Sequence, residues 1–181
     1  MDQMTLESSL YWAQAMVFQG KRVLDAERIE GHITYKITRM EEQFFLNAIG
    51  KALRWIGELK SQGVCVQPID SFLAVAGVAQ LVRNKREHDD EYSGPQKKTE
   101  VMSDASQPGS NLTIKVGQSV TVHRNGTVLL GGTVDVSEVI EAAIELATHL
   151  RTEQHKYWEG RSLGDRRNIE HFLAPEGLVS R

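Results

Sequence analysis

The sequence contains a single cysteine, Cys65, among 181 residues. One thiol cannot form an intrachain disulfide, so the fold has to be stable without covalent cross-links, as is usual in a reducing compartment. The neighbours of Cys65 are the apolar residues Val64 and Val66. This context favours a buried, small apolar side chain over a reactive thiol.

Long apolar runs are also missing. No stretch of the sequence comes near the roughly 18 apolar residues that suggest a membrane span. The first seven residues include the acids Asp2 and Glu7 and no apolar run, so no signal peptide is expected. These absences predict a cytoplasmic protein with no membrane partner.

An excess of positive charge is absent as well, since 21 basic and 24 acidic residues give a net charge of −3. Contact with nucleic acid would therefore require a local basic patch. Glycine-rich phosphate loops, a dinucleotide fingerprint and a nucleophile elbow are not found in the sequence, which argues against an enzyme built on such a loop. His32, His149 and His155 show no metal-ligand spacing with carboxylates or the lone cysteine, and neither a metal site nor a cofactor is expected.

The first half of the chain carries apolar residues at helical spacing. A first helix is expected from about Thr5 to Ile29. A second should begin at Thr38, where Glu41 completes a capping box, and end near Gly63. The third, from about Ser71 to Tyr92 with a cap at Asp70 or Ser71, is apolar on every side in its first half, which predicts a central, buried helix.

The second half changes from polar loop to strands and back to helix. Three alternating apolar runs, beginning at Leu112, Val120 and Val128, predict an antiparallel meander, because Asn125-Gly126 is a strong hairpin signal. A last helix should start at Asp135 and run to about Glu159. The predicted fold is a mainly α single domain, a bundle of four to five helices with an inserted three-stranded β-meander. Its parts are helical regions at about 4–92 and 135–160, a mobile loop at 94–110, the meander at 111–132 and a basic tail at 161–181.

The polar end of the third predicted helix carries the residues best suited to chemistry. Arg83 and His88 are separated by four residues, and Asn84 follows the arginine directly. On a helix, Asn84 and His88 are one turn apart, as are Arg83 and Glu87. An arginine can hold a phosphate with two donors, and a histidine can accept a proton near neutral pH. Together they suffice for metal-free cleavage of RNA, in which the base activates a ribose 2′-hydroxyl.

A second pair with the same spacing, Arg166 and His171, lies in a predicted loop, and we interpret it as a coincidence. The alternative for the first pair is an ordinary charged helix end, with i,i+4 ion pairs such as Arg86 with Asp90.

The run from Leu81 to His88, in the third helix of a mainly helical small domain, resembles the motif of the HEPN (higher eukaryotes and prokaryotes nucleotide-binding) superfamily. That resemblance covers the helices between about residues 4 and 160. It implies a metal-independent endoribonuclease or RNA-binding protein, as found in toxin–antitoxin and defence systems. Arg83 would bind phosphate, His88 would act as the base, and Asn84 would orient them. It also implies a homodimer whose two motifs face a shared cleft, and a cognate partner protein.

The alternative function is a non-catalytic helical module for dimerisation or interaction. Two further groups of residues bear on this choice. Lys51 and Arg54 are expected to be surface residues, although they could extend a cleft. The tryptophans, at positions 12, 55 and 158, are expected to anchor the core or an interface rather than stack on bases.

Overall fold

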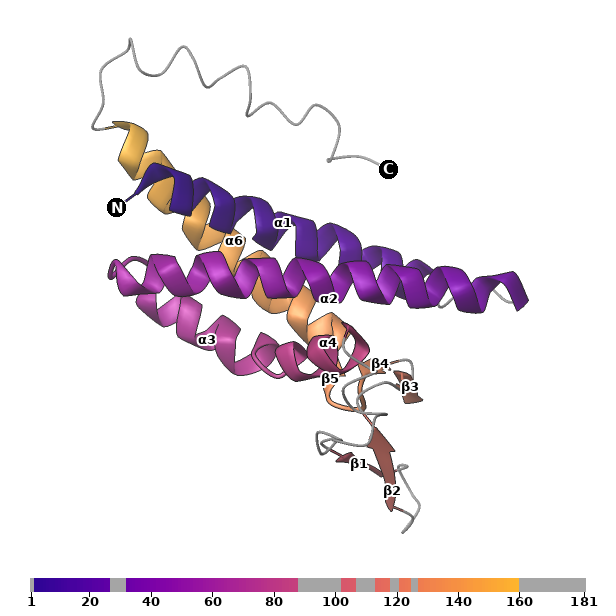
Figure 1. The fold of residues 1–181 in the computed structure, drawn as a ribbon. Coiled ribbons are helices and arrows are strands. Elements are labelled where there is room, and N and C mark those ends of the chain that lie inside the picture. The colour runs from indigo at the N-terminus through magenta and orange to yellow at the C-terminus, as the bar shows by residue number, and fades with distance from the viewer. Residues whose placement is uncertain are drawn as a thin grey trace.

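The computed structural model describes residues 2–26, 32–87, 102–106, 113–117, 121–124 and 127–159, with side chains placed outside 32–36, 102–117 and Arg124. Five helices form most of this part of the chain (Figure 1). They are α1 (Gln3–Ala26), α2 (His32–Ser61), α3 (Val66–Ala76), α4 (Ala79–Glu87) and α6 (Val136–Glu159). A three-stranded antiparallel sheet accompanies them, so the predicted helical bundle with a small meander is confirmed.

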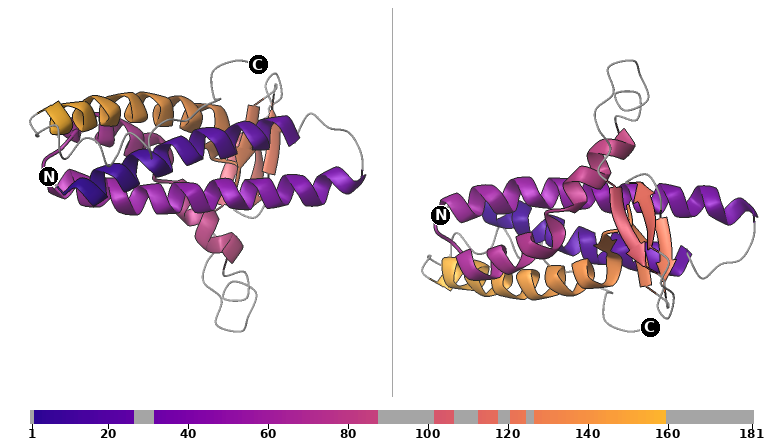
Figure 2. Two further views of the ribbon diagram at one scale, coloured as in Figure 1. Left: turned by 90° about the horizontal axis from the view of Figure 1, so that it is seen from above. Right: turned by 90° about the horizontal axis from the view of Figure 1, so that it is seen from below.

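Helices α1 and α2 run side by side in opposite directions and form the centre of the bundle (Figures 1 and 2). Helix α6 packs against α1 and α3, while α3 and α4 pack against α2. The core between them consists of fully buried apolar side chains from all five helices and from the sheet. Its largest members are Phe45, Phe72, Leu6, Met16, Leu46, Ile49, Ile56, Leu59, Ile69, Leu130, Leu146 and Leu150.

Helix α1 starts at a side-chain cap, since the Asp2 carboxylate accepts the backbone N–H of Thr5 at 3.0 Å. Gly20, which the sequence marks as a weak point, lies at a close contact between helices. A Cβ atom there would lie 2.6 Å from Ile140 of α6 and 3.0 Å from Phe45 of α2. The absence of a side chain therefore lets α1 approach both neighbours.

Helix α2 begins earlier than predicted, at His32 instead of Thr38. The proposed capping box is wrong: Thr38 is buried within the helix. Glu41 pairs with Arg22 and Gln19 of α1 instead of closing a cap. Glu41 therefore finds its partners on another helix, and spacing along the sequence cannot reveal such partners.

The predicted third helix is two helices. Helix α3 begins at Val66, so the predicted cap at Asp70 or Ser71 is wrong, and both residues lie inside the helix. Pro68 lies in the first turn, where a missing N–H is tolerated. The chain turns at Gly77 before α4 begins at Ala79. The prediction of a central buried helix is also wrong, since Val78 and Leu81 are exposed and α2 occupies the centre.

The meander contains β3 (Thr121–Arg124), β4 (Thr127–Leu130) and β5 (Val134–Asp135), in that order. Strands β3 and β4 pair antiparallel up to Arg124 and Thr127, and the predicted turn residues Asn125 and Gly126 lie outside the described residues. Gly131 and Gly132 both have positive φ and form the second turn. The sheet packs on α6 through β4, where Val128 and Leu130 are buried.

Two predictions about the strands need correction. The run 113–117, expected to open the meander, is β2 (Thr113–Gly117) and pairs with β1 (Met102–Ser106) in a separate two-stranded sheet. Strand β1 falls inside the segment expected to be a mobile loop. Met102 is the only large apolar residue in β1, so no alternating pattern of apolar residues predicted this strand.

Helix α6 confirms the predicted last helix. The Asp135 carboxylate accepts the N–H groups of Ser137 at 2.8 Å and Glu138 at 3.2 Å. The predicted basic tail at 161–181 lies outside the described residues. Within the described part of the chain, none of the helices combines the length and apolarity needed to cross a bilayer.

Candidate functional site

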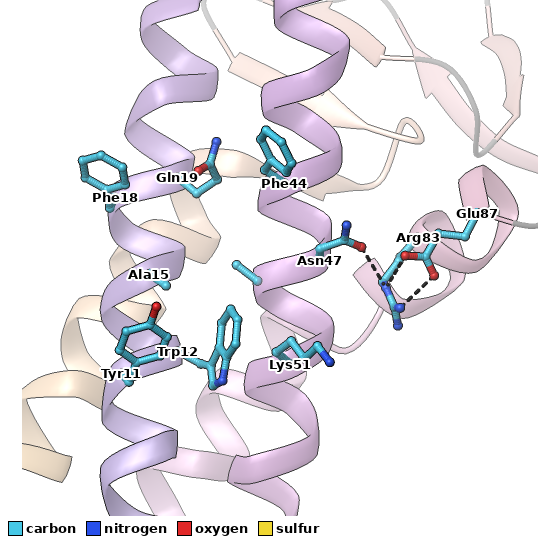
Figure 3. A pocket seen from close by; sticks show the side chains of 11 residues that line it. Tyr11, Trp12, Ala15, Phe18, Gln19, Phe44, Asn47, Lys51, Arg83 and Glu87 are labelled. Atoms are coloured by element: carbon cyan, nitrogen blue, oxygen red, sulfur yellow. Dashed lines mark hydrogen bonds and ion pairs between the residues drawn. The ribbon is translucent and has the colours of Figure 1, made fainter.

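A groove of about 570 Å³ opens between α1, α2 and α4. Figure 3 shows its two sides. Aromatic rings from α1 stand on one side, and polar side chains from α2 and α4 face each other on the other. The lining side chains are Tyr11, Trp12, Ala15, Phe18, Gln19, Phe44, Asn47, Ala48, Lys51, Arg83 and Glu87. The groove is therefore where the predicted phosphate-binding arginine meets other elements of the fold.

Arg83 reaches into this groove from α4 and is held on both sides. Its Nε donates to Asn47 Oδ1 of α2 at 3.2 Å, and its Nη2 lies 2.7 Å from the Glu87 carboxylate (Figure 3). The second contact is the i,i+4 neighbourhood expected on a helix. The guanidinium thus has a fixed position, with its charge partly balanced by one carboxylate.

Gly50 of α2 makes room for the Arg83 side chain. A Cβ atom on Gly50 would lie 2.9 Å from Arg83 Nη1 and 3.0 Å from Arg83 Cδ, closer than real side chains approach each other. No motif in the sequence marks Gly50 as part of a site. Its only signal was a glycine in the middle of a strongly helical pattern, where glycine costs stability unless something approaches the backbone.

The other two predicted site residues are not joined to Arg83 by the described contacts. Asn84 does not line the groove, and its side-chain oxygen accepts a hydrogen bond from Gln80 at 2.8 Å. His88 lies outside the described residues, directly after the last residue of α4. The structure therefore places Arg83 in a groove without testing the histidine.

Lys51 gives the groove a second positive charge, one helical turn beyond Asn47 on α2. It forms no ion pair with any side chain in the described part of the structure. Lys51 is exposed, as expected of a surface residue, and because it also lines the groove the alternative in which it extends a cleft fits as well. Arg54 does not line the groove and lies over the ring of Trp55, 5.7 Å from its centroid.

Trp12 both packs against the core and lines the groove. Its indole meets the Tyr11 ring edge to face, with centroids 5.1 Å apart and an interplanar angle of 86°. The expectation that Trp12 anchors the core is confirmed. The exposed rings of Tyr11, Phe18 and Phe44 beside it are a feature that the sequence analysis missed, because helical periodicity does not tell which face stays uncovered.

A buried polar cluster fixes α4 next to the groove. Arg86, one turn beyond Arg83, lies 2.6 Å from the Glu42 carboxylate of α2 and donates to the Thr121 hydroxyl of β3 at 3.0 Å. Thr121 in turn donates to Glu42 at 2.7 Å. The side chains of Glu42 and Arg86 are only 1% and 5% exposed, so this cluster joins α2, α4 and β3 away from water.

Cys65 is half-buried against the core, as its apolar neighbours predicted. Burial raises the pKa of its thiol, and the charge of Glu153 adds to this effect. A raised pKa lowers the thiolate fraction at neutral pH, so a nucleophilic role for Cys65 is disfavoured. Among the described residues, no group of three histidine, cysteine or acidic side chains is arranged to hold a metal ion.

No protein-family model matches this sequence, and no curated protein or solved structure is significantly similar to it.

Proposed function

We propose that this protein binds RNA in the groove between α1, α2 and α4 and cleaves it without a metal ion, as a HEPN-like endoribonuclease. One observation supports this most strongly. Arg83, the arginine of the Arg-x4-His pair, is held by Asn47 in an open groove that also contains Lys51, a cation without an ion pair to any described side chain.

The proposed reaction uses His88 as the general base. His88 removes the proton of a ribose 2′-hydroxyl, and the oxygen attacks the adjacent phosphorus. The bond from phosphorus to the 5′-oxygen breaks, which leaves a 2′,3′-cyclic phosphate and a 5′-hydroxyl that takes up a proton. The Arg83 guanidinium stabilises the crowded phosphate through two donors, and Asn84 orients the polar end of α4.

The Glu87 carboxylate competes with phosphate for the Arg83 guanidinium. It pairs with Arg83 at 2.7 Å, so a phosphate must share the guanidinium with it or displace it. Neutralising this acid should therefore strengthen RNA binding. Because the pair is only partly buried, we expect Glu87→Gln to raise the affinity for RNA by about two- to fivefold.

Cleavage of a labelled RNA pool in EDTA tests the proposal. The wild-type protein should cleave and leave 2′,3′-cyclic phosphate ends. Losing the base should lower the rate by about 10²–10⁴-fold in His88→Ala, and losing the phosphate donor by about 10²-fold or more in Arg83→Ala.

Matched controls are available on α6, which contributes nothing to the groove. Arg151 and His149 are exposed there, so Arg151→Ala and His149→Ala should cleave like wild type. No cleavage by the clean wild-type protein, or equal loss in the control variants, would reject the proposed enzyme.

The wider setting is proposed from the same resemblance. It comprises a cytoplasmic location, a role in a toxin–antitoxin or defence system, a cognate partner protein, and a homodimer in which two Arg83–His88 pairs share one cleft. Each half of such a dimer would need the other for a complete site. A mixture of Arg83→Ala and His88→Ala proteins would then regain activity that neither has alone.

A second candidate is the non-catalytic helical interaction or dimerisation module. It is favoured by the exposed apolar side chains along α1 and α2, which include Met4, Tyr11, Phe18, Met40 and Phe44. Analytical ultracentrifugation separates the two functions. Stable association that Phe44→Ser abolishes, in a protein without ribonuclease activity, would favour the module.

A further inference from the structure

The aromatic side of the groove is unusual for a water-facing surface. The chain has 12 aromatic residues in all (5 Phe, 3 Trp and 4 Tyr), and four of them line this one groove. Tyr11, Phe18 and Phe44 are 62%, 55% and 50% exposed. These rings are therefore accessible from solvent, and Figure 3 shows them on the adjoining helices α1 and α2.

Two of the rings are held in place by contacts that leave them accessible. Tyr11 packs edge to face on Trp12, and the guanidinium of Arg22 lies over Phe18, 5.8 Å from the ring centroid. Trp12 is itself packed against the core. A ring that is already oriented loses little freedom when a second ring stacks on it.

The charge of the groove favours a polyanion. Among the described side chains that line it, two cations, Lys51 and Arg83, against one carboxylate, Glu87, leave one net positive charge in a protein whose net charge is −3. Lys51 has no ion-pair partner within the described structure, so its charge is available to a ligand. Aromatic rings next to a cation match the two parts of a nucleotide, the base and the phosphate.

A second copy of the chain fits this surface less well. In a twofold contact the same patch faces itself, so two net positive grooves would be brought together. Lys51 and the Arg83–Glu87 pair would also lose water without gaining an acid. The rings therefore favour a nucleic acid over direct contact with a second copy, and the proposed homodimer has to join through another face, so that the two grooves border an open cleft without touching.

We infer that Tyr11 and Phe44 form a stacking subsite for the unpaired bases of single-stranded RNA, with Lys51 on the adjacent phosphate. This inference rests on the proposed RNA-binding function and names the substrate class as single-stranded. In a duplex the bases are already stacked on each other, so they cannot reach these rings. Single-stranded binding by aromatic platforms tolerates most sequences, because every base has a flat face.

Binding of a fluorescein-labelled, 2′-O-methyl single-stranded RNA tests the inference, because this probe lacks the 2′-hydroxyl and cannot be cleaved by the proposed reaction. Tyr11→Leu and Phe44→Leu keep an apolar side chain but remove the flat face. We expect each to weaken binding by about fivefold or more, without changing its salt dependence. Lys51→Ala should instead lower the salt slope by about 0.7. Tyr157→Leu, a partly exposed aromatic residue on α6 outside the groove, should bind like wild type.

The outcomes separate the subsite from the proposed function. If the wild-type protein binds no RNA of any kind, both the proposed function and the stacking subsite are wrong. Strong binding that is unchanged in Tyr11→Leu and Phe44→Leu, or equal binding of duplex RNA or of polyphosphate, would overturn only the stacking subsite. If the wild-type protein forms a dimer that dissociates in Phe44→Ser, the rings bind a second copy of the chain. This result would also overturn the stacking subsite.

Discussion

Gly50 of α2 lies directly beneath the side chain of Arg83. Two effects of a methyl group at this position oppose each other. Alanine raises helix propensity by about 0.5–1 kcal/mol, but its Cβ occupies the space that Arg83 uses. The residue that positions the predicted phosphate-binding arginine is therefore one that carries no chemistry of its own.

We predict that Gly50→Ala weakens RNA binding, towards the level of Arg83→Ala, while the free energy of unfolding changes by less than about 1 kcal/mol. Gly57→Ala on the same helix is the matched control, because nothing lies within 4 Å of a Cβ at that position. The free energy of unfolding of Gly57→Ala should rise by about 0.5–1 kcal/mol, and this variant should bind RNA like wild type. Urea unfolding and fluorescence anisotropy measure the two effects, and unchanged RNA binding in Gly50→Ala would contradict the role of this contact.

At the scale of elements, the buried cluster of Glu42, Arg86 and Thr121 joins α2, α4 and β3. Helix α4 has only nine residues, too few to be stable alone, so its position depends on such contacts. Because Arg83 lies one turn before Arg86, the cluster also determines where the groove places its arginine. The sheet thereby contributes to the site without lining it.

We predict that Glu42→Gln lowers the free energy of unfolding by about 2 kcal/mol or more, since it removes the carboxylate from a guanidinium that is 5% exposed. Glu145→Gln, at an exposed position of α6, serves as the matched control and should stay within about 0.5 kcal/mol of wild type. Both values come from urea unfolding curves. A Glu42→Gln protein as stable as the control would show that the cluster does not hold these elements together.

At the scale of the whole molecule, the ion pair between Arg22 of α1 and Glu41 of α2 makes the stability of the fold depend on pH. The hydrogen bond from Arg22 lowers the pKa of Glu41 below its ordinary value of 4.5, and a hydrogen bond from Gln19 adds to this. A carboxyl group with a lowered pKa in the folded state stabilises the fold above its unfolded pKa. That contribution is lost as the pH falls through the lower, folded pKa.

We predict that Glu41→Gln is less stable than wild type at pH 7, and that the difference between the two proteins shrinks as the pH falls below about 4.5. Glu138→Gln on α6, a carboxylate without an ion pair to a described side chain, controls for the general effect of charge removal. Urea unfolding at a series of pH values gives these differences. A difference that stays constant down to pH 3 would exclude Glu41 as its source.

The sequence by itself determined the kinds of elements and several of their ends. Apolar spacing predicted most of the helices, Asp135 predicted the start of α6, and alternating apolar residues predicted β3 and β4, because these signals act over a few neighbouring residues. The same local signals failed where a distant partner competed. Glu41 pairs with Arg22 rather than Thr38, and β2 pairs with β1 rather than opening the meander.

Only the tertiary structure decided where the chemistry-bearing residues lie. The sequence identified Arg83 from its spacing to His88, but Lys51, Gly50 and the exposed rings join it only when α1, α2 and α4 pack together. Spacing along one helix reports which residues share a face. Whether that face is buried, exposed or part of a groove depends on which other helices cover it, and those contacts lie dozens of residues away.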